Sequence, residues 1–187
     1  MNAYVLGNGT SRQAVNLESL RKHGKIYGCN ALYRDFSPDV LIATDPGISG
    51  EIQHSGYALK HEFYTRNPLP KLGAKRIEYN FGYSSGPIAL TYASNSEANK
   101  IYILGFDFAG IAGKFNNVYA GTAHYKRQND PETYFGNWVD QVTTIISAHP
   151  NKTYVRIIQQ GTLIPKSFAQ LVNLEHQPLE LFCDHHK

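Results

Sequence analysis

Short apolar segments rich in β-branched and aromatic residues recur along this chain, and segments with helical spacing separate most of them. They predict strands at residues 3–6, 25–29, 39–44, 62–65, 76–80, 100–104 and 153–158. The segments between them predict helices at residues 11–22, 46–57, 87–96, 131–148 and 166–174. Alternating strands and helices are typical of βαβ units, which build a parallel sheet with helices on both faces. We therefore expect an α/β fold, a Rossmann-like three-layer sandwich with a mainly parallel sheet.

The length of 187 residues suits one domain with a sizeable core. With 42% hydrophobic and 18% charged residues, the composition is that of a folded protein and not of a disordered one. No internal repeat or linker divides the chain. We expect a single domain over residues 1–187, with a core over about 1–160 and a C-terminal extension over 161–187 whose last four residues are frayed.

The composition also excludes several classes of partner. A formal net charge of +3, without a run of Lys or Arg, argues against nucleic acid. No stretch approaches the length of a membrane span, and the N-terminus lacks the basic and apolar regions of a signal peptide. Cys29 and Cys183 are far apart and form no metal-binding pair, so we expect reduced thiols and a cytoplasmic protein. Oligomerisation stays open, because the sequence shows no symmetry.

The first expected strand breaks into a glycine-rich turn, Gly7-Asn8-Gly9, followed by Thr10 and Ser11 at the start of the first expected helix. Glycines can adopt positive φ and allow a ligand to approach the backbone closely. The first N–H groups of a helix have no partner within it, and with the helix dipole they suit an anion such as phosphate. The same residues also form ordinary turns, so this motif alone is weak.

Polar residues follow four of the expected strands, namely Asn8, Asn30, Asp45 and Asp107. In a parallel sheet these positions meet at the carboxyl edge, where such folds bind ligands. Residues 109–131, rich in Gly, Asn and aromatics, lack periodicity and predict a long functional or mobile loop near this edge. By contrast, the aromatic positions around Trp138 have helical spacing, and we assign them to the core and not to a ligand site.

Three segments, in the same order, resemble the bacterial lipooligosaccharide sialyltransferases. Gly7–Ser11 resembles their Gly-Asn-Gly-Pro-Ser opening, with Thr10 in place of proline, and Tyr27–Asn30 resembles their Cys-Asn strand end. Ser84–Gly86, followed by a helix and the strand that ends in 105–108, resembles their Ser-Gly helix and Gly-(hydrophobic)-Asp-(aromatic) turn. Motility-accessory glycosyltransferases and archaeal hydroxymethylpterin diphosphokinases share this skeleton. The resemblance covers roughly residues 3–160 through few matched positions.

The resemblance implies an inverting glycosyltransferase that uses a nucleotide sugar, such as a CMP-sugar, and requires no metal or other cofactor. It implies a catalytic histidine in the loop after the Asp-aromatic turn, with tyrosines that assist the departing phosphate; the loop offers His124, Tyr119 and Tyr125. The local sequence around His124 differs from the family's His-Ser. The implied nucleotide-binding residues are Gly7, Asn8, Gly9, Thr10, Ser11, Asn30, Ser84, Ser85, Gly86 and Asp107. The acceptor is not identified.

Two other functions stay open on the same fold. Asp45 and Asp107 could hold Mg²⁺ through a diphosphate, which would make the protein a pyrophosphokinase or another phosphoryl transferase. The chain could also bind a nucleotide without catalysis. For individual residues, His124 could be a solvated loop histidine, and Asp107 could cap its own turn.

Overall fold

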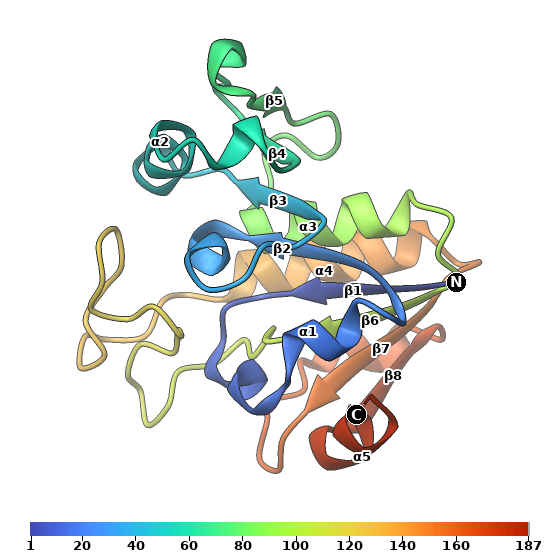
Figure 1. Ribbon diagram of the computed structural model, residues 1–187. Coiled ribbons are helices and arrows are strands. Elements are labelled where there is room, and N and C mark those ends of the chain that lie inside the picture. The colour runs from blue at the N-terminus through green and yellow to red at the C-terminus, as the bar shows by residue number, and fades with distance from the viewer. Residues whose placement is uncertain (187) are drawn as a thin grey trace.

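The computed structural model describes residues 1–186, which form one sheet of eight parallel strands in the order β5-β4-β3-β2-β1-β6-β7-β8 (Figure 1). The strands are β1 (Asn2–Leu6), β2 (Gly24–Cys29), β3 (Val40–Ala43), β4 (Phe63–Thr65), β5 (Lys75–Arg76), β6 (Lys100–Leu104), β7 (Thr153–Ile158) and β8 (Leu174–Pro178). Because all strands are parallel, their carboxyl ends share one edge of the sheet.

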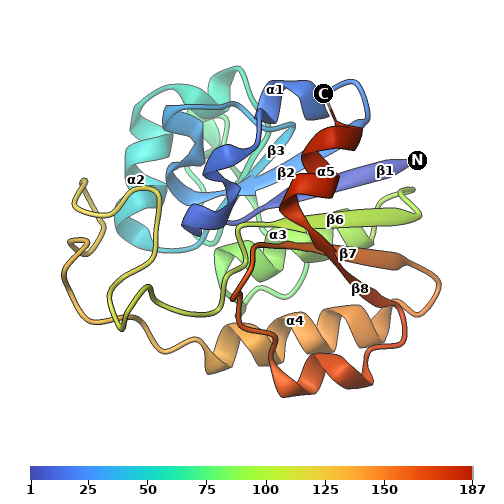
Figure 2. The same ribbon diagram turned by 90° about the horizontal axis from the view of Figure 1, so that it is seen from below.

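Helices cover both faces of the sheet (Figure 2). On one face lie α1 (Leu17–Leu20), α2 (Pro46–His54) and α5 (Leu179–His185), and on the other α3 (Ser85–Ser94) and α4 (Gly136–Ala148). The expected α/β, Rossmann-like three-layer sandwich is therefore confirmed. None of the helices within residues 1–186 combines the length and apolarity that crossing a bilayer requires.

Alternation along β1 divides the core into two clusters. Tyr4 and Leu6 point toward the face covered by α1, α2 and α5, whereas Ala3 and Val5 point toward α3 and α4, and all four are fully buried. Successive side chains of a strand face opposite sides, so a central strand covered on both faces has to be apolar throughout. This explains why the sequence marks β1 as a continuous apolar run.

The prediction of one helix over residues 11–22 is wrong in its extent. Residues Thr10–Ala14 form a 3₁₀ helix, Val15 is extended, and α1 covers only Leu17–Leu20. The break occurs because the side chain of Asn16 accepts a hydrogen bond from the Glu18 backbone nitrogen at 3.2 Å, which starts a new helix there. Similarly, α4 begins at Gly136 and not near residue 131.

The C-terminal segment belongs to the sheet and is not frayed over its described part. Residues 166–170 form a 3₁₀ helix, β8 then pairs with β7, and α5 packs beside them. His186 is buried, and its Nε2 atom lies 3.0 Å from the hydroxyl of Tyr4 in the central strand. This contact anchors the chain just after α5; Lys187, also expected to be frayed, lies outside the described residues.

Candidate functional site

A cavity of about 260 Å³ opens at the carboxyl edge of the sheet, beside the ends of β1 and β6. Strand β1 pairs with β2 on one side and with β6 on the other, so the order of the strands reverses direction here. Such a reversal is the topological switch point at which parallel sheets bind ligands. The cavity brings together Asn8, Asn30, Asp45 and Asp107, the four polar residues at the strand ends. Its other lining residues are Gly7, Gly9, Cys29, Thr44, Ser84, Gly86, Pro87, Gly105, Phe106, Phe108, Ala109, Phe115, Asn116, Asn117, Phe135 and Trp138.

The glycines of the first turn allow two chain segments to meet. A Cβ atom on Gly7 would lie 2.6 Å from the carbonyl oxygen of Gly105, and one on Gly9 would lie 2.3 Å from a carboxylate oxygen of Asp107. Neither glycine uses the positive φ that glycine allows, whereas Gly105 does, with φ of 70°. These two positions need glycine for close packing of the β1 and β6 ends.

The amides of Thr10 and Ser11, expected to bind an anion at the start of the first helix, donate to side chains of the protein in this conformation. The Thr10 nitrogen donates to Asn116 Oδ1 at 3.0 Å, and the Ser11 nitrogen donates to Asp107 Oδ2 at 3.2 Å. The Ser11 hydroxyl also donates to Asp107, and Asn116 Nδ2 donates to the same carboxylate at 3.0 Å. Asp107 therefore ties the first turn to the long loop.

Three other helices begin at the cavity wall. Asp45 precedes α2, Ser84 and Gly86 belong to the start of α3, and Phe135 and Trp138 belong to the start of α4. The first N–H groups of a helix have no partner within it, and the helix dipole makes that end positive. The convergence of three such ends on one cavity makes it suited to an anion.

Ser85 lies behind this wall and not on it. Its hydroxyl oxygen accepts the Thr44 backbone N–H at 3.0 Å and lies 2.9 Å from the Thr44 hydroxyl, and both residues are buried. Its neighbours Ser84 and Gly86 line the cavity directly. Ser85 thus fixes the end of β3 against the start of α3.

The two asparagines at the strand ends differ in their hydrogen bonding. The side chain of Asn8 is satisfied, because Nδ2 donates to the Cys29 carbonyl at 3.0 Å and Oδ1 accepts from Arg12 at 3.1 Å. Asn30 has a left-handed backbone with φ of 55°, and its Oδ1 atom is buried without a partner within residues 1–186. A buried acceptor without a donor lowers the stability of the folded protein, so Asn30 Oδ1 is a candidate acceptor for a hydrogen bond from a ligand.

Two buried arginines, which the sequence did not mark as important, support the walls. Arg156 donates to the Phe106 carbonyl at 2.7 and 3.0 Å, and Arg12 donates to the Gly7 carbonyl at 2.7 Å. Within residues 1–186 neither arginine forms an ion pair with a carboxylate. Burial lowers the pKa of Arg156 to about 10. Arg156 still carries positive charge behind the cavity at neutral pH.

The assignment of Trp138 to the core alone is wrong. Trp138 and Phe135 are half-buried and both line the cavity, with ring centroids 5.4 Å apart and planes at 62°. The helical stripe continues into the core only through later positions of α4, such as Val142 and Ile146. Tyr134, expected in the same stripe, is 81% exposed because it precedes the helix.

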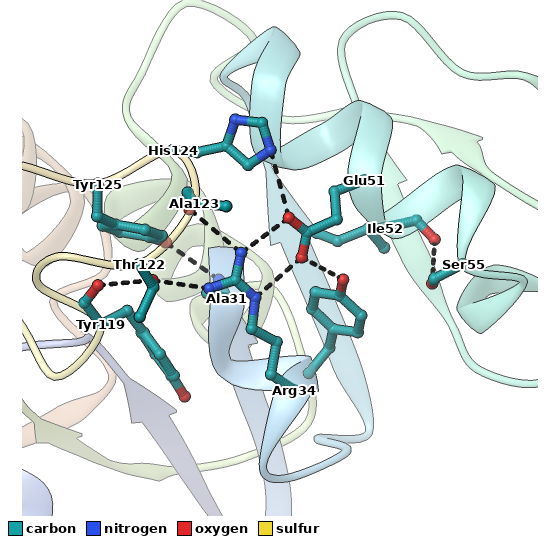
Figure 3. A network of polar contacts seen from close by, with 11 residues as sticks. Ala31, Arg34, Glu51, Ile52, Ser55, Tyr119, Thr122, Ala123, His124 and Tyr125 are labelled. Atoms are coloured by element: carbon teal, nitrogen blue, oxygen red, sulfur yellow. Dashed lines mark hydrogen bonds and ion pairs between the residues drawn. The ribbon is translucent and has the colours of Figure 1, made fainter.

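The three residues predicted to be catalytic lie together in the long loop, outside the cavity lining (Figure 3). His124 Nε2 lies 3.3 Å from Glu51, and its ring stands against Gly47, where a Cβ atom would be 2.6 Å from Nδ1. The Tyr125 hydroxyl accepts the Ala31 backbone N–H at 3.1 Å.

Tyr119, also in the long loop, is buried, and its hydroxyl accepts from Arg12 at 3.3 Å. Burial raises the pKa of both loop tyrosines, that of Tyr119 to about 12. In this conformation the two tyrosines therefore hold the loop in place.

The tip of the loop is fixed by an ion-pair network (Figure 3). Two nitrogens of Arg34 donate to the two carboxylate oxygens of Glu51 at 2.9 and 2.8 Å. The same guanidinium donates to the Thr122 hydroxyl at 2.8 Å and to the Ala123 carbonyl at 3.2 Å. The hydrogen bonds from Arg34 lower the pKa of Glu51. The loop therefore spans from the cavity wall to α2.

No family model, curated protein or solved structure gives a significant match to this chain. The resemblance to the sialyltransferases accordingly stays a prediction. It rests on residues 7–11, 27–30, 84–86 and 105–108.

Proposed function

We propose that the cavity binds a nucleotide and that the protein transfers the sugar of a nucleotide-sugar donor, such as a CMP-sugar, to an acceptor hydroxyl. The observation that carries this proposal is the convergence of the starts of α2, α3 and α4 on one cavity at the switch point of a parallel sheet. Helix N-termini favour phosphate. The unpartnered Oδ1 of Asn30 would accept a hydrogen bond from a donor such as a ribose hydroxyl or a base amino group.

The size of the cavity supports a compact donor group. Its volume of about 260 Å³ lies just below the range of roughly 300–1,000 Å³ that is usual for small-ligand sites. Such a volume suits one nucleotide better than a dinucleotide. The sugar would then extend toward the mouth, where the acceptor arrives.

We assign the proton-accepting role to His124. Its ring stands against Gly47, two positions after the cavity residue Asp45, and Glu51 holds its Nε2 atom. In the transfer, the acceptor oxygen bonds to the anomeric carbon, the bond from that carbon to the phosphate oxygen breaks, and the proton passes to the imidazole. Because the hydroxyls of Tyr119 and Tyr125 are engaged elsewhere, we give these residues a supporting role.

Asp45 favours a second candidate function, phosphoryl transfer with Mg²⁺. It is an exposed carboxylate on the cavity wall, and its side chain makes no capping hydrogen bond to α2. The carboxylate of Asp107 already accepts bonds from Ser11 and Asn116, so Asp45 and the substrate phosphates would hold the ion. This candidate predicts ATP affinity that is lost with a chelator and in Asp45→Asn.

The test uses Trp138, the only tryptophan of the chain, as a reporter in the cavity wall. Its fluorescence is titrated with CMP, UMP, GDP and ATP, with and without Mg²⁺, and calorimetry repeats each titration. We expect one nucleotide to bind without metal and to bind more weakly to Asn30→Ala. Asn80→Ala serves as the control, because Asn80 also has positive φ but lies outside the cavity lining.

Turnover is then measured as release of free nucleotide from the matching nucleotide sugar. We expect release from the wild type, and at least tenfold slower release from His124→Ala with unchanged nucleotide affinity. Absence of binding to every nucleotide would overturn the proposal. Tight binding without release from any donor would instead identify a non-catalytic nucleotide binder.

A further inference from the structure

The cavity combines two chemically different walls. Five of its lining residues are aromatic: Phe106, Phe108, Phe115, Phe135 and Trp138. The opposite chemistry comes from the starts of α2, α3 and α4, which are the positive ends of the helix dipoles. A ligand that satisfies both walls carries a flat apolar group and an anionic group, which is the description of a nucleoside phosphate.

Among these aromatic residues, Trp138 has a ring that a hydrogen bond orients. Its Nε1 atom donates to the Ser84 hydroxyl oxygen at 2.7 Å, while Gln141, one turn later in α4, accepts the Ser84 backbone N–H at 2.9 Å. Two side chains of α4 therefore form hydrogen bonds with the residue at the N-cap position of α3. Because of this double contact, the indole ring keeps a fixed position relative to the start of α3.

Phe135 supports the indole from the side, in an edge-on arrangement. Further along α4, Val142, Ile145 and Ile146 are buried in the core, so the helix cannot shift easily. An aromatic ring that is half-buried, oriented by a hydrogen bond and placed on a rigid helix is preorganised for stacking.

We propose that Trp138 is the stacking platform for the nucleobase of the ligand, and that Ser84 is the residue that orients it. This inference rests on the proposed nucleotide-binding function and adds to it the way in which the base is bound.

The experiment compares ligands with and without a base. Calorimetry measures binding of CMP, UMP, GMP and AMP to the wild type, with ribose 5-phosphate as the base-free counterpart. In Trp138→Leu we expect the best nucleotide to bind about tenfold to one-hundredfold more weakly, since stacking on an aromatic side chain has that magnitude. The affinity for ribose 5-phosphate should stay within twofold.

Two further variants separate stacking from packing. Trp138→Phe keeps an aromatic ring and should lose no more than about fivefold in nucleotide affinity. Ser84→Ala keeps the indole ring but removes the hydrogen bond that orients it, so nucleotide affinity should fall severalfold while that of ribose 5-phosphate does not change. Thermal unfolding followed by circular dichroism confirms that each variant is folded.

The outcomes are distinct. Equal losses for nucleotides and ribose 5-phosphate in Trp138→Leu, or no loss for either, would overturn the stacking role even if nucleotides bind the wild type. If Trp138→Leu does not fold, the same comparison in Trp138→Phe and Ser84→Ala decides: unequal losses support the platform, and equal losses reject it. Failure of the wild type to bind any nucleotide would overturn the proposed function itself, and the platform with it.

Discussion

Asn116 Oδ1 accepts both hydrogen bonds that Thr10 donates, one from the backbone nitrogen at 3.0 Å and one from the hydroxyl at 2.8 Å. This contact joins the long loop to the first turn of the chain, across 106 positions of sequence. It also occupies the Thr10 amide, one of the N–H groups at the start of the first helix. The start of the first helix is therefore used to hold the loop, and the helix starts that remain at the cavity wall are those of α2, α3 and α4.

We expect Asn116→Ala to loosen the loop and to destabilise the protein. The substitution leaves the donors of Thr10 and part of the Asp107 carboxylate without partners, at a cost of about 1–3 kcal/mol in the free energy of unfolding. Urea denaturation measures this change, and hydrogen exchange at Thr10 should become faster. Asn129→Ala, an exposed position of the same loop, is the control and should change stability by less than about 0.5 kcal/mol. Equal effects of the two variants would contradict the role of Asn116.

Asn30→Gly should raise stability while it weakens ligand binding. Glycine adopts the left-handed backbone of Asn30 without strain, and the substitution removes a buried acceptor that has no donor within residues 1–186. We expect the free energy of unfolding to rise by about 1 kcal/mol. The control Asn80→Gly loses the hydrogen bond of 2.8 Å that the Asn80 side chain donates to the Thr91 hydroxyl, so its free energy of unfolding should not rise. A loss of stability in Asn30→Gly would show that Oδ1 already has a partner in the free protein.

Two glycine substitutions should act in opposite directions. Gly7→Ala places a Cβ atom 2.6 Å from the Gly105 oxygen and 2.8 Å from the Phe106 ring, so stability should fall by about 2–3 kcal/mol. Gly50→Ala, within α2, meets no atom within 4 Å and should raise stability by about 0.5–1 kcal/mol. Chemical denaturation of both variants tests the pair. Tolerance of Ala at Gly7 would mean that the ends of β1 and β6 can separate at little cost.

The stability of the protein should fall as the pH drops below 6.5, partly because of His186. Burial is the main cause that lowers the pKa of His186 below its ordinary value of 6.5, and the nearby His23 and His185 lower it further. The unfolded chain then binds the proton more readily than the folded one. The contribution of His186 to stability is therefore complete above pH 6.5 and is lost progressively as the pH falls below it. Tyr4, whose hydroxyl faces Nε2, and Tyr102 also contact the ring.

The melting temperature at about pH 7.5 and pH 5.5 measures this effect. His186→Leu should show a smaller difference between the two values than the wild type, whereas the exposed His185→Ala should keep most of it. Some dependence will remain in both variants, because burial also lowers the pKa of His176. An unchanged difference in His186→Leu would exclude His186 as a source.

Local sequence was sufficient to predict most of the sheet and the residues at its carboxyl edge, but it did not predict β8, and β5 is shorter than the strand expected over residues 76–80. Strands β6 and β7 match their expected ranges, and Asn8, Asn30 and Asp107 line one cavity as expected. This works because a buried parallel strand is a continuous apolar run, and the position where the run ends places the next residue at the edge.

Contacts distant in sequence could not be predicted in this way. Nothing local marks Asn116 as the partner of Thr10, or Tyr4 as the residue that anchors His186, because each pair is far apart in the chain. Trp138 has the spacing of a core residue, and only the position of α4 at the end of the sheet turns its ring toward the cavity. A helical period reports which side of a helix is apolar, but not whether its first turn faces the core or a ligand.

The order of the strands leaves β5 and β8 at the two borders of the sheet. An open border offers unpaired backbone groups to any extended chain nearby, which is a route to aggregation. Here one border consists of only two residues, Lys75 and Arg76, both cationic and exposed, and the other ends at Pro178, which has no N–H to donate. The two borders of this sheet of eight parallel strands thus carry features that disfavour further growth, charge at β5 and a proline at the end of β8.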